Sequence, residues 1–148
     1  MLFRSRDGNW KGEYKDRHIT FTESYDNGKL LTGNAVTEDG KTNTYSGSRG
    51  VPPAFKGGIE GFGRYLSRNI IYPDLARQKG IQGRVILTFV VEKTGELSDI
   101  KVSKSVIPII DDEAIRVLKL SPKWVPGTQF GMPVRVQYSV PISFALGN

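Results

Sequence analysis

The segment 132–146, MPVRVQYSVPISFAL, offers the clearest chemistry in this sequence, and that chemistry lies in its backbone. Polar and apolar residues alternate along it, as they do in a half-buried β-strand. Pro133 and Pro141 lack a backbone N–H, and because they are an even number of residues apart, both missing donors lie on one edge of the strand. The amides of three residues between the prolines point to the same edge: Arg135, Gln137 and Ser139.

This edge has two interpretations. Prolines on an edge strand can serve simply to prevent edge-to-edge aggregation. The edge could also accept an extended peptide as an added strand, because three unblocked amides remain between the prolines. A few net hydrogen bonds of roughly 0.5–1.5 kcal/mol each, less the cost of ordering the peptide, predict an affinity of about micromolar.

Side chains that could catalyse a reaction are few and scattered. His18 is the only histidine, and its polar surroundings predict a surface position. Asp111, Asp112 and Glu113 could be taken for a metal site, but a helix start with Asp111 as N-cap explains them without a metal. The stretch 57–63, GGIEGFG, lacks the Gly-Lys-Ser/Thr of a phosphate-binding loop and is interpreted as a flexible approach to a helix. We therefore predict no enzyme activity, no cofactor and no metal.

The composition is that of a soluble globular protein with a packed core, at 38% hydrophobic and 24% charged residues. The net charge is +6, but the basic residues are scattered singly, which argues against nucleic-acid binding. Cysteine is absent, which excludes disulfides and thiol catalysis and is compatible with an oxidising compartment. No apolar run is long enough for a membrane span, and MLFRSRDG has no signal-peptide core, so we expect any anchor or export signal to precede these residues.

Residues 1–47 predict a small antiparallel meander. Its three segments with strand character are 17–25, 29–36 and 41–45. Asp-Asn-Gly and Glu-Asp-Gly join them and supply the positive φ angles of tight turns. Such a small sheet is expected to pack on the next part of the chain or to oligomerise. Residues 48–58, rich in Gly, Ser and Pro, are predicted to link it to a domain at 59–148.

The second domain is predicted to hold two major helices. The first shows four apolar residues at helical spacing: Ile59, Phe62, Leu66 and Ile70. A short helix is expected between Pro73 and Gly80. The second major helix is expected from Asp111 to Pro122, with Trp124 filling the core beside its end.

Three strands complete the predicted domain, which makes the fold α+β. The strand 83–91 is apolar on both faces, which predicts a central position with cover on both faces or in a dimer. A turn at 93–96 leads to a second strand that includes Ile100 and Val102. The last strand is the proline-containing segment, which is predicted to form an edge of the sheet.

Three segments, in this order and spacing, resemble the C-terminal domain of TonB energy transducers: YPDLARQKGIQGRVILTFVVEKTGELSDIKVSKS, DDEAIRVLKLSPKWVPG and PVRVQYSVPISFAL. The likeness covers 72–146, and its most specific pieces include Tyr72-Pro73, Gly95 and Trp124-x-Pro126-Gly127. The N-terminal part, with GNWKGEY and YDNGKLLTG, resembles MORN-like hairpin repeats.

The resemblance implies a periplasmic domain, anchored to the inner membrane in the full-length protein. It would bind the TonB box of outer-membrane TonB-dependent transporters by β-strand addition to the last strand. Force would come from an inner-membrane proton-channel complex through a membrane helix and spacer that these segments lack, so we expect the chain to bind but not to transduce by itself. The peptide-binding residues carried over by position are Val134, Arg135, Val136, Gln137, Tyr138, Ser139 and Val140.

A second interpretation stays open. The edge strand could pair with its own copy in a homodimer, which would make the chain a periplasmic regulatory or assembly module. Its size in solution and a titration with transporter peptides separate the two interpretations.

Overall fold

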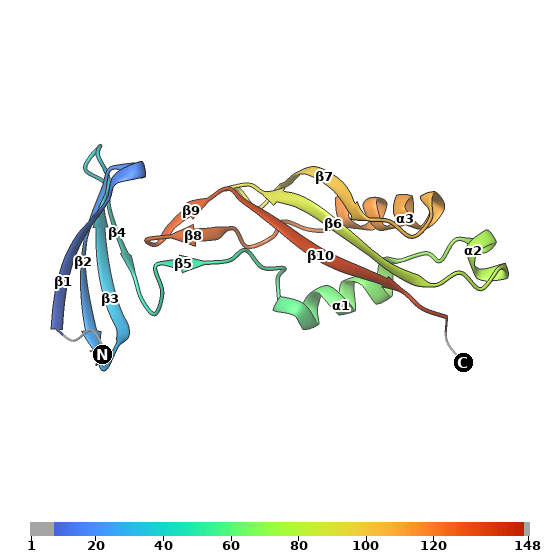
Figure 1. The fold of residues 1–148 in the computed structure, drawn as a ribbon, viewed down its shortest axis with the longest axis horizontal. Coiled ribbons are helices and arrows are strands. Elements are labelled where there is room, and N and C mark those ends of the chain that lie inside the picture. The colour runs from blue at the N-terminus through green and yellow to red at the C-terminus, as the bar shows by residue number, and fades with distance from the viewer. Residues whose placement is uncertain (1–7, 147–148) are drawn as a thin grey trace, which may run out of the picture. The chain divides into compact units, whose positions relative to one another are not determined.

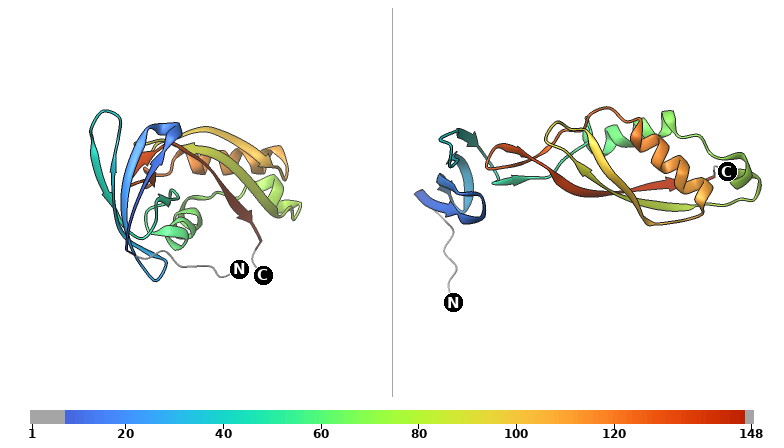
Figure 2. Two further views of the ribbon diagram at one scale, coloured as in Figure 1. Left: turned by 60° about the vertical axis from the view of Figure 1, so that its left-hand side comes forward. Right: turned by 90° about the horizontal axis from the view of Figure 1, so that it is seen from above.

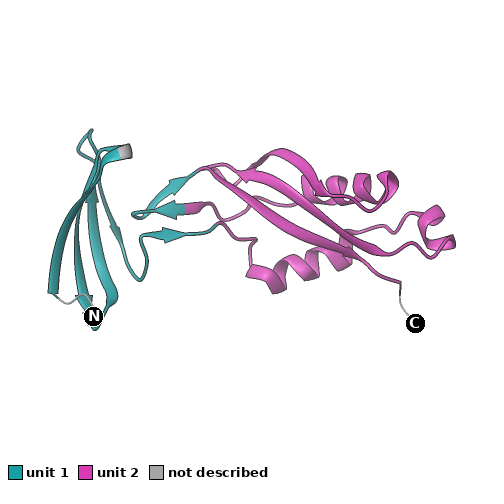
Figure 3. Ribbon diagram, viewed as in Figure 1, with its two compact units in different colours: residues 1–52, 128–134 teal, residues 53–127, 135–148 magenta. Residues whose placement is uncertain are grey.

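The computed structural model describes residues 8–146, apart from the side chain of Asp16. They form two compact units (Figures 1 and 3). Unit 1 comprises Met1–Pro52 and Thr128–Val134, and unit 2 comprises Pro53–Gly127 and Arg135–Asn148. The stretch MLFRSRDG, searched for a signal peptide, lies outside the described residues except for its last glycine.

Unit 1 contains the predicted meander as a four-stranded antiparallel sheet in the order β1-β2-β3-β4. Its strands are β1 Gly8–Tyr14, β2 Ile19–Asp26, β3 Lys29–Val36 and β4 Thr42–Tyr45, and η1, a short 3-10 helix, spans Lys15–Arg17. The strand β1 was not among the predicted segments. The turn between β2 and β3 has the expected positive φ angles, 49° at Asn27 and 80° at Gly28.

Two glycines let aromatic rings lie flat across this sheet. Gly12 is paired with Phe21, and Gly33 is paired with Tyr45. A Cβ at either glycine would lie 2.3 Å from an atom of the paired ring. Any larger residue would therefore displace the aromatic side chains that form the core of unit 1.

That core is completed by a distant hairpin of the chain. The strands β8 Gly127–Gln129 and β9 Met132–Val134 form a small sheet with β5, Gly50–Val51, in the order β5-β8-β9. Phe130, in the hairpin turn, is 2% exposed, and its ring centroid lies 5.1 Å from that of Phe21 and 5.6 Å from that of Tyr45. The predicted linker 48–58 thus contains a paired strand, and residues 128–134 group with the N-terminal residues.

A buried carboxylate stands beside these rings. Glu23 accepts hydrogen bonds from the Tyr45 hydroxyl at 2.7 Å, from the Tyr25 hydroxyl at 2.8 Å and from Arg49 at 2.6 and 2.7 Å. Burial by itself would raise the pKa of Glu23, but these bonds, led by that from Arg49, outweigh it and hold the pKa below 4.5. The group is therefore a satisfied structural element of unit 1.

Unit 2 is a three-stranded antiparallel sheet in the order β10-β6-β7, with helices on one face (Figure 2). Its strands are β6 Gly83–Val91, β7 Leu97–Lys104 and β10 Val136–Phe144, and its helices are α1 Gly58–Asn69, α2 Asp74–Gln78 and α3 Pro108–Lys119. Val85, Leu87, Phe89 and Val91 are fully buried, and α1 and α3 contribute to the same core cluster. The predicted α+β fold with a three-stranded antiparallel sheet is confirmed.

Two predicted helix starts are corrected. The helix α3 begins at Pro108 after the N-cap Ile107, so Asp111 lies in its first turn and is not the N-cap. The Asp111 carboxylate instead reaches back to accept the Val106 N–H at 3.0 Å. Pro108 occupies the first helical position, which its fixed φ suits. The stretch 57–63 was predicted to be a flexible approach to a helix, but it is part of the helix from Gly58 on, where α1 starts.

The central position predicted for β6 is confirmed. Cover on both faces is not found in the described part of the chain, and the alternative, cover in a dimer, stays a prediction. Ile86 and Val90 are half-buried and lie outside the core cluster. Between them, the Thr88 hydroxyl lies 2.8 Å from that of Ser139 and 3.2 Å from that of Ser103. A row of hydroxyl groups thus crosses this face between the two apolar residues.

Trp124 fills the core near the end of α3, as predicted. It is 4% exposed and makes edge contacts with Phe89 and Phe55. The turn between β6 and β7 passes close to Trp124 at Gly95, which has a φ of 88°. Only glycine fits there, because a Cβ would lie 2.1 Å from the Trp124 carbonyl oxygen. His18 is exposed, as predicted.

We expect Phe130→Ala to unfold the sheet of unit 1. Removing a fully buried phenylalanine costs about 3–5 kcal/mol, which is a large part of the stability of so small a sheet. Backbone amide NMR shifts of β2, β3 and β4 should collapse toward random-coil values. Val51→Ala is the control, since Val51 is 49% exposed, and it should leave them in place. Native shifts in Phe130→Ala would show that this ring does not hold the meander.

Candidate functional site

The strand β10 lies at an edge of the sheet of unit 2. It pairs with β6 in an unbroken antiparallel register from Val136 opposite Val91 to Phe144 opposite Gly83. The sheet order places β7 on the other side of β6, and within residues 8–146 no strand pairs with the outer edge of β10. Val140, Ile142 and Phe144 are buried and alternate with exposed residues, which confirms the predicted face assignment.

Pro141 fixes which amides of β10 point outward. It is paired with Ile86, and because proline has no N–H, this pair takes a non-hydrogen-bonded position of the ladder. Hydrogen-bonded and non-bonded pairs alternate, so Gln137 and Ser139 occupy non-bonded positions too. The N–H and C=O groups of Gln137 and Ser139 therefore point away from β6.

The structure divides the predicted strand into two pieces, which corrects the expected continuous edge. Pro133 and Val134 belong to β9, which pairs with β8, while β10 begins only at Val136. Phe130 and Gly131 have φ of 52° and 77°, which form the tight turn between β8 and β9. Of the predicted site residues, Val136, Gln137, Tyr138, Ser139 and Val140 share one strand, whereas Val134 and Arg135 precede it.

Arg135 is fixed beside the start of β10. Its guanidinium donates to both carboxylate oxygens of Glu92, at 2.8 and 3.1 Å. Hydrogen bonds from Arg135 and Ser98 lower the pKa of the Glu92 carboxyl group, and the bond from Arg135 has the larger effect. Both partners are substantially exposed, so we regard this pair as orienting Arg135 and assign it little stability.

A largely apolar groove of about 490 Å³ follows β10. It is lined by Ile59, Phe62, Gly63, Leu66, Ser67 and Ile70 on the helix side, and by Tyr138, Ser139, Val140, Pro141 and Ser143 on the strand side. A groove over one face of a strand would meet alternate residues. This groove meets four consecutive residues, 138–141, so it runs along the backbone edge of β10.

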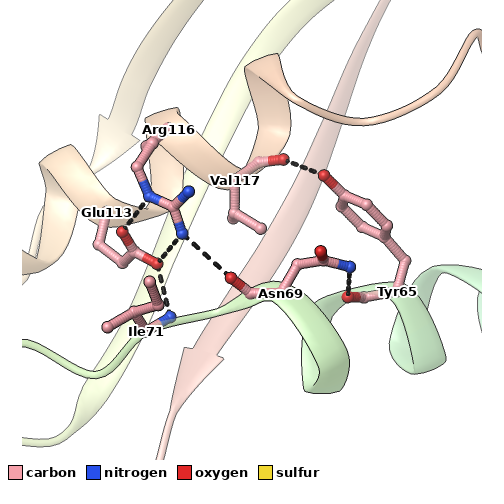
Figure 4. Close-up of polar contacts among 6 residues, drawn as sticks. All are labelled: Tyr65, Asn69, Ile71, Glu113, Arg116 and Val117. Carbon is pink, nitrogen blue, oxygen red and sulfur yellow. Dashed lines mark hydrogen bonds and ion pairs between the residues drawn. The ribbon is translucent and has the colours of Figure 1, made fainter.

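Polar contacts with α3 hold α1 in place (Figure 4). Glu113 accepts hydrogen bonds from the Ile71 N–H at 2.6 Å and from Arg116 at 2.6 and 2.8 Å. Arg116 also donates to the Asn69 carbonyl at 3.0 Å, and the Tyr65 hydroxyl donates to the Val117 carbonyl at 2.7 Å. The end of α1 is therefore tied to α3 at several points, which positions the helix wall of the groove.

Sequence reasoning missed two parts of this site. Ile59 was predicted to share one face of a helix with Phe62, Leu66 and Ile70, and it lines the groove with them, but it is 92% exposed. Glu113 was explained only by its place at a helix start, whereas it is buried and accepts the Ile71 N–H of the α1–α2 connection. The presence of a carboxylate and an arginine three residues apart, Glu113 and Arg116, was the available signal for a fixed ion pair.

Two general searches of the described residues gave no further site. No group of three or more His, Asp or Glu side chains is placed to hold a metal ion in residues 8–146. Among the helices described here, none combines the length and the apolar character that crossing a bilayer requires.

Comparison with known proteins assigns the second half of the chain. The family described as Gram-negative bacterial TonB protein C-terminal matches residues 68–146, just over half of the chain. Protein TonB of Pasteurella multocida (strain Pm70) is 29% identical over 133 residues, which are 90% of this chain and 50% of that protein. The chain thus spans about half the length of this curated relative.

Two solution NMR structures of the Helicobacter pylori TonB C-terminal domain are also similar, both at 26% identity. One has a TM-score of 0.45 and covers 58% of this chain and 78% of its own, and the other has a TM-score of 0.47 and covers 59% and 91%. The family match confirms the TonB resemblance found in the sequence. The MORN-like character of the N-terminal strands stays a prediction.

We expect Glu113→Gln to lower the free energy of unfolding by about 1–2 kcal/mol at pH 7, because a buried charge-assisted hydrogen-bond network is lost. Burial by itself would raise the pKa of Glu113, but the bonds from Arg116 and Ile71 outweigh it and hold the pKa below 4.5. The carboxylate therefore stabilises the fold above pH 4.5, and this stability is lost as the pH falls through the lower folded-state pKa.

Urea unfolding at pH 3 to 7 checks this prediction. The difference between wild type and Glu113→Gln should shrink as the pH falls. Asp112→Asn, which removes an exposed neighbouring charge on α3, is the control and should cost less at every pH. A difference between wild type and Glu113→Gln that stays constant with pH would contradict the assigned role.

Proposed function

Because the chain belongs to the family of Gram-negative bacterial TonB C-terminal domains, we propose that it is a periplasmic module that binds the TonB box of outer-membrane TonB-dependent transporters. The TonB box, a short extended segment, would add to the sheet of unit 2 beside β10. Site residues are Val136, Gln137, Tyr138, Ser139 and Val140 of that strand, with Val134 and Arg135 at its approach.

The outer edge of β10 is the observation that carries this proposal. In the described part of the chain it is a sheet edge whose Gln137 and Ser139 groups point away from β6. Both residues are exposed, which leaves this edge accessible to a partner. An extended peptide could pair with these groups through main-chain hydrogen bonds.

The available length of edge limits the affinity. From Val136 to Ser139 the edge offers the groups of two outward-facing residues before Pro141 removes the next donor. With roughly 0.5–1.5 kcal/mol for each net hydrogen bond and a cost for ordering the peptide, backbone pairing supports a dissociation constant in the micromolar range or weaker. A weak and reversible bond suits a module that must release its transporter after each cycle.

Transmission of force belongs to the same proposal. Since the chain covers half of its curated relative, we assign the link to an inner-membrane proton-channel complex to the longer protein of which such a domain is part. The N-terminal anchor of that protein would hold it to the inner membrane. A pull along the chain would then reach the transporter through the peptide paired with β10.

We expect Gln137→Pro to abolish binding of transporter peptides while the domain stays folded. The substitution removes one outward-pointing N–H and leaves every bond between β10 and β6 in place. The measurement is a fluorescence-anisotropy titration with fluorescein-labelled ten-residue peptides from the N-terminal segments of TonB-dependent transporters encoded in the same genome. Circular dichroism and thermal unfolding report the fold.

Gln137→Ala is the matched control, because it removes the side chain and keeps the N–H, and it should bind within about twofold of wild type. An unfolded Gln137→Pro would show that this amide points inward. Equal binding by Gln137→Pro and wild type would exclude strand addition here. A wild-type chain that forms a tight dimer and refuses every peptide would favour the homodimeric assembly module.

A further inference from the structure

The groove between α1 and β10 lies where the side chains of an added strand would go. Side chains of a strand alternate between its two faces, and a strand beside β10 shares the pleat of its neighbour. Its residues opposite Tyr138, Val140 and Ile142 therefore point to the face of the sheet that α1 and α3 cover. Directly beyond β10 on that face stands α1, and the groove is the space between them.

The lining of this groove is suited to aliphatic side chains. Ile59, Phe62, Leu66 and Ile70 line it from α1, and Tyr138, Val140 and Pro141 line it from β10, together with three serines, Ser67, Ser139 and Ser143. Ile59 is 92% exposed, although an isoleucine at this helical spacing would ordinarily be buried. An added strand would cover it and gain the free energy of removing apolar surface from water.

The opposite face beside the same edge has a different character. There, Ser139 contacts Thr88, which in turn contacts Ser103, so the sheet presents hydroxyl groups. The two faces of an added strand would thus meet an apolar wall on one side and a polar surface with solvent on the other. Side chains of alternating kind fit this arrangement best.

We propose that the α1–β10 groove selects extended peptides that carry aliphatic side chains at alternate positions, with polar residues between them. This inference rests on the proposed strand addition and adds the residue pattern that the site recognises. It assigns the selection to α1, nearly all of which precedes residue 68, where the family match begins.

Two substitutions in α1 test this without disturbing the core. Ile59→Ser removes an exposed apolar side chain and should weaken binding about three- to tenfold, as expected for the loss of part of an aliphatic contact. Gly63→Leu fills the groove, since a Cβ at Gly63 meets no heavy atom within 4 Å, and it should weaken binding by tenfold or more. Both variants should keep the circular dichroism spectrum of wild type.

Each variant has a matched control. Leu120→Ser removes a side chain that is 65% exposed and does not line the groove, and it should bind as wild type does. Gly63→Ala adds only a methyl group to the groove and should weaken binding less than Gly63→Leu does.

The probes are the same fluorescein-labelled ten-residue transporter peptides, each prepared with single aliphatic residues changed to alanine. An alanine at a position facing the groove should weaken binding to wild type. The affinity of Gly63→Leu for this alanine-substituted peptide should be close to that of wild type, because the smaller side chain leaves room for the added leucine. An alanine at the intervening positions should have little effect in either protein.

The outcomes separate this inference from the proposed function. If wild type binds and Gln137→Pro does not, strand addition stands. Unchanged binding by Ile59→Ser and Gly63→Leu would then overturn the groove proposal by itself. If wild type binds none of the peptides, both proposals are overturned. A dimer that is weakened by Ile59→Ser and that excludes the peptides would show that a second copy of the chain occupies the groove.

Discussion

The one-sided pairing of β10 is the constraint on which the proposed chemistry depends. A three-stranded sheet must have two edges, and the order β10-β6-β7 makes β10 one of them. Pro141 then sets the direction in which the amides of β10 point, because a proline opposite Ile86 cannot take a hydrogen-bonded position. A single residue thus orients the outward groups of Gln137 and Ser139. It also shortens the usable edge, which limits unwanted pairing with other strands.

An edge alone binds peptides with little discrimination, because every residue has the same backbone. The helix α1 adds side chains to the site, and its position depends on the network around Glu113, which ties its last residue, Asn69, and the nearby Ile71 to α3. Glu113 is nine-tenths buried and stays ionised because Arg116 and the Ile71 N–H bind it. Glu113, Arg116 and Asn69 are not among the residues that line the groove. In this proposal, the backbone of β10 binds the peptide and the side chains of α1 select it.

Unit 1 shows how a sheet too small for its own core becomes stable. Glycines at positions 12 and 33 allow Phe21 and Tyr45 to cross the sheet, and Phe130 from a hairpin far along the chain completes the cluster. Arg49 contributes both to this cluster, with its guanidinium 4.5 Å from the centre of the Phe21 ring, and to the ion pair with Glu23. Residues 128–134 thus serve unit 1 although they lie within the family-matched part of the sequence. Residues 128–134 group with unit 1, although their neighbours in sequence belong to unit 2, because burying the Phe130 ring in the core of unit 1 is favourable.

The sequence by itself determined the elements of this protein whose signals are local. Alternation along 136–144, the Asn-Gly turn after β2 and the buried face of β6 are all written in neighbouring residues, and so is the direction of the missing donor at Pro141. Tertiary structure decided what depends on distant partners. It divided the proline-containing segment at Arg135, exposed Ile59 beside β10, buried Glu113 against the end of α1 and placed Phe130 among the rings of unit 1. Periodicity says which residues share a face, but only packing decides whether that face meets a core, a groove or solvent.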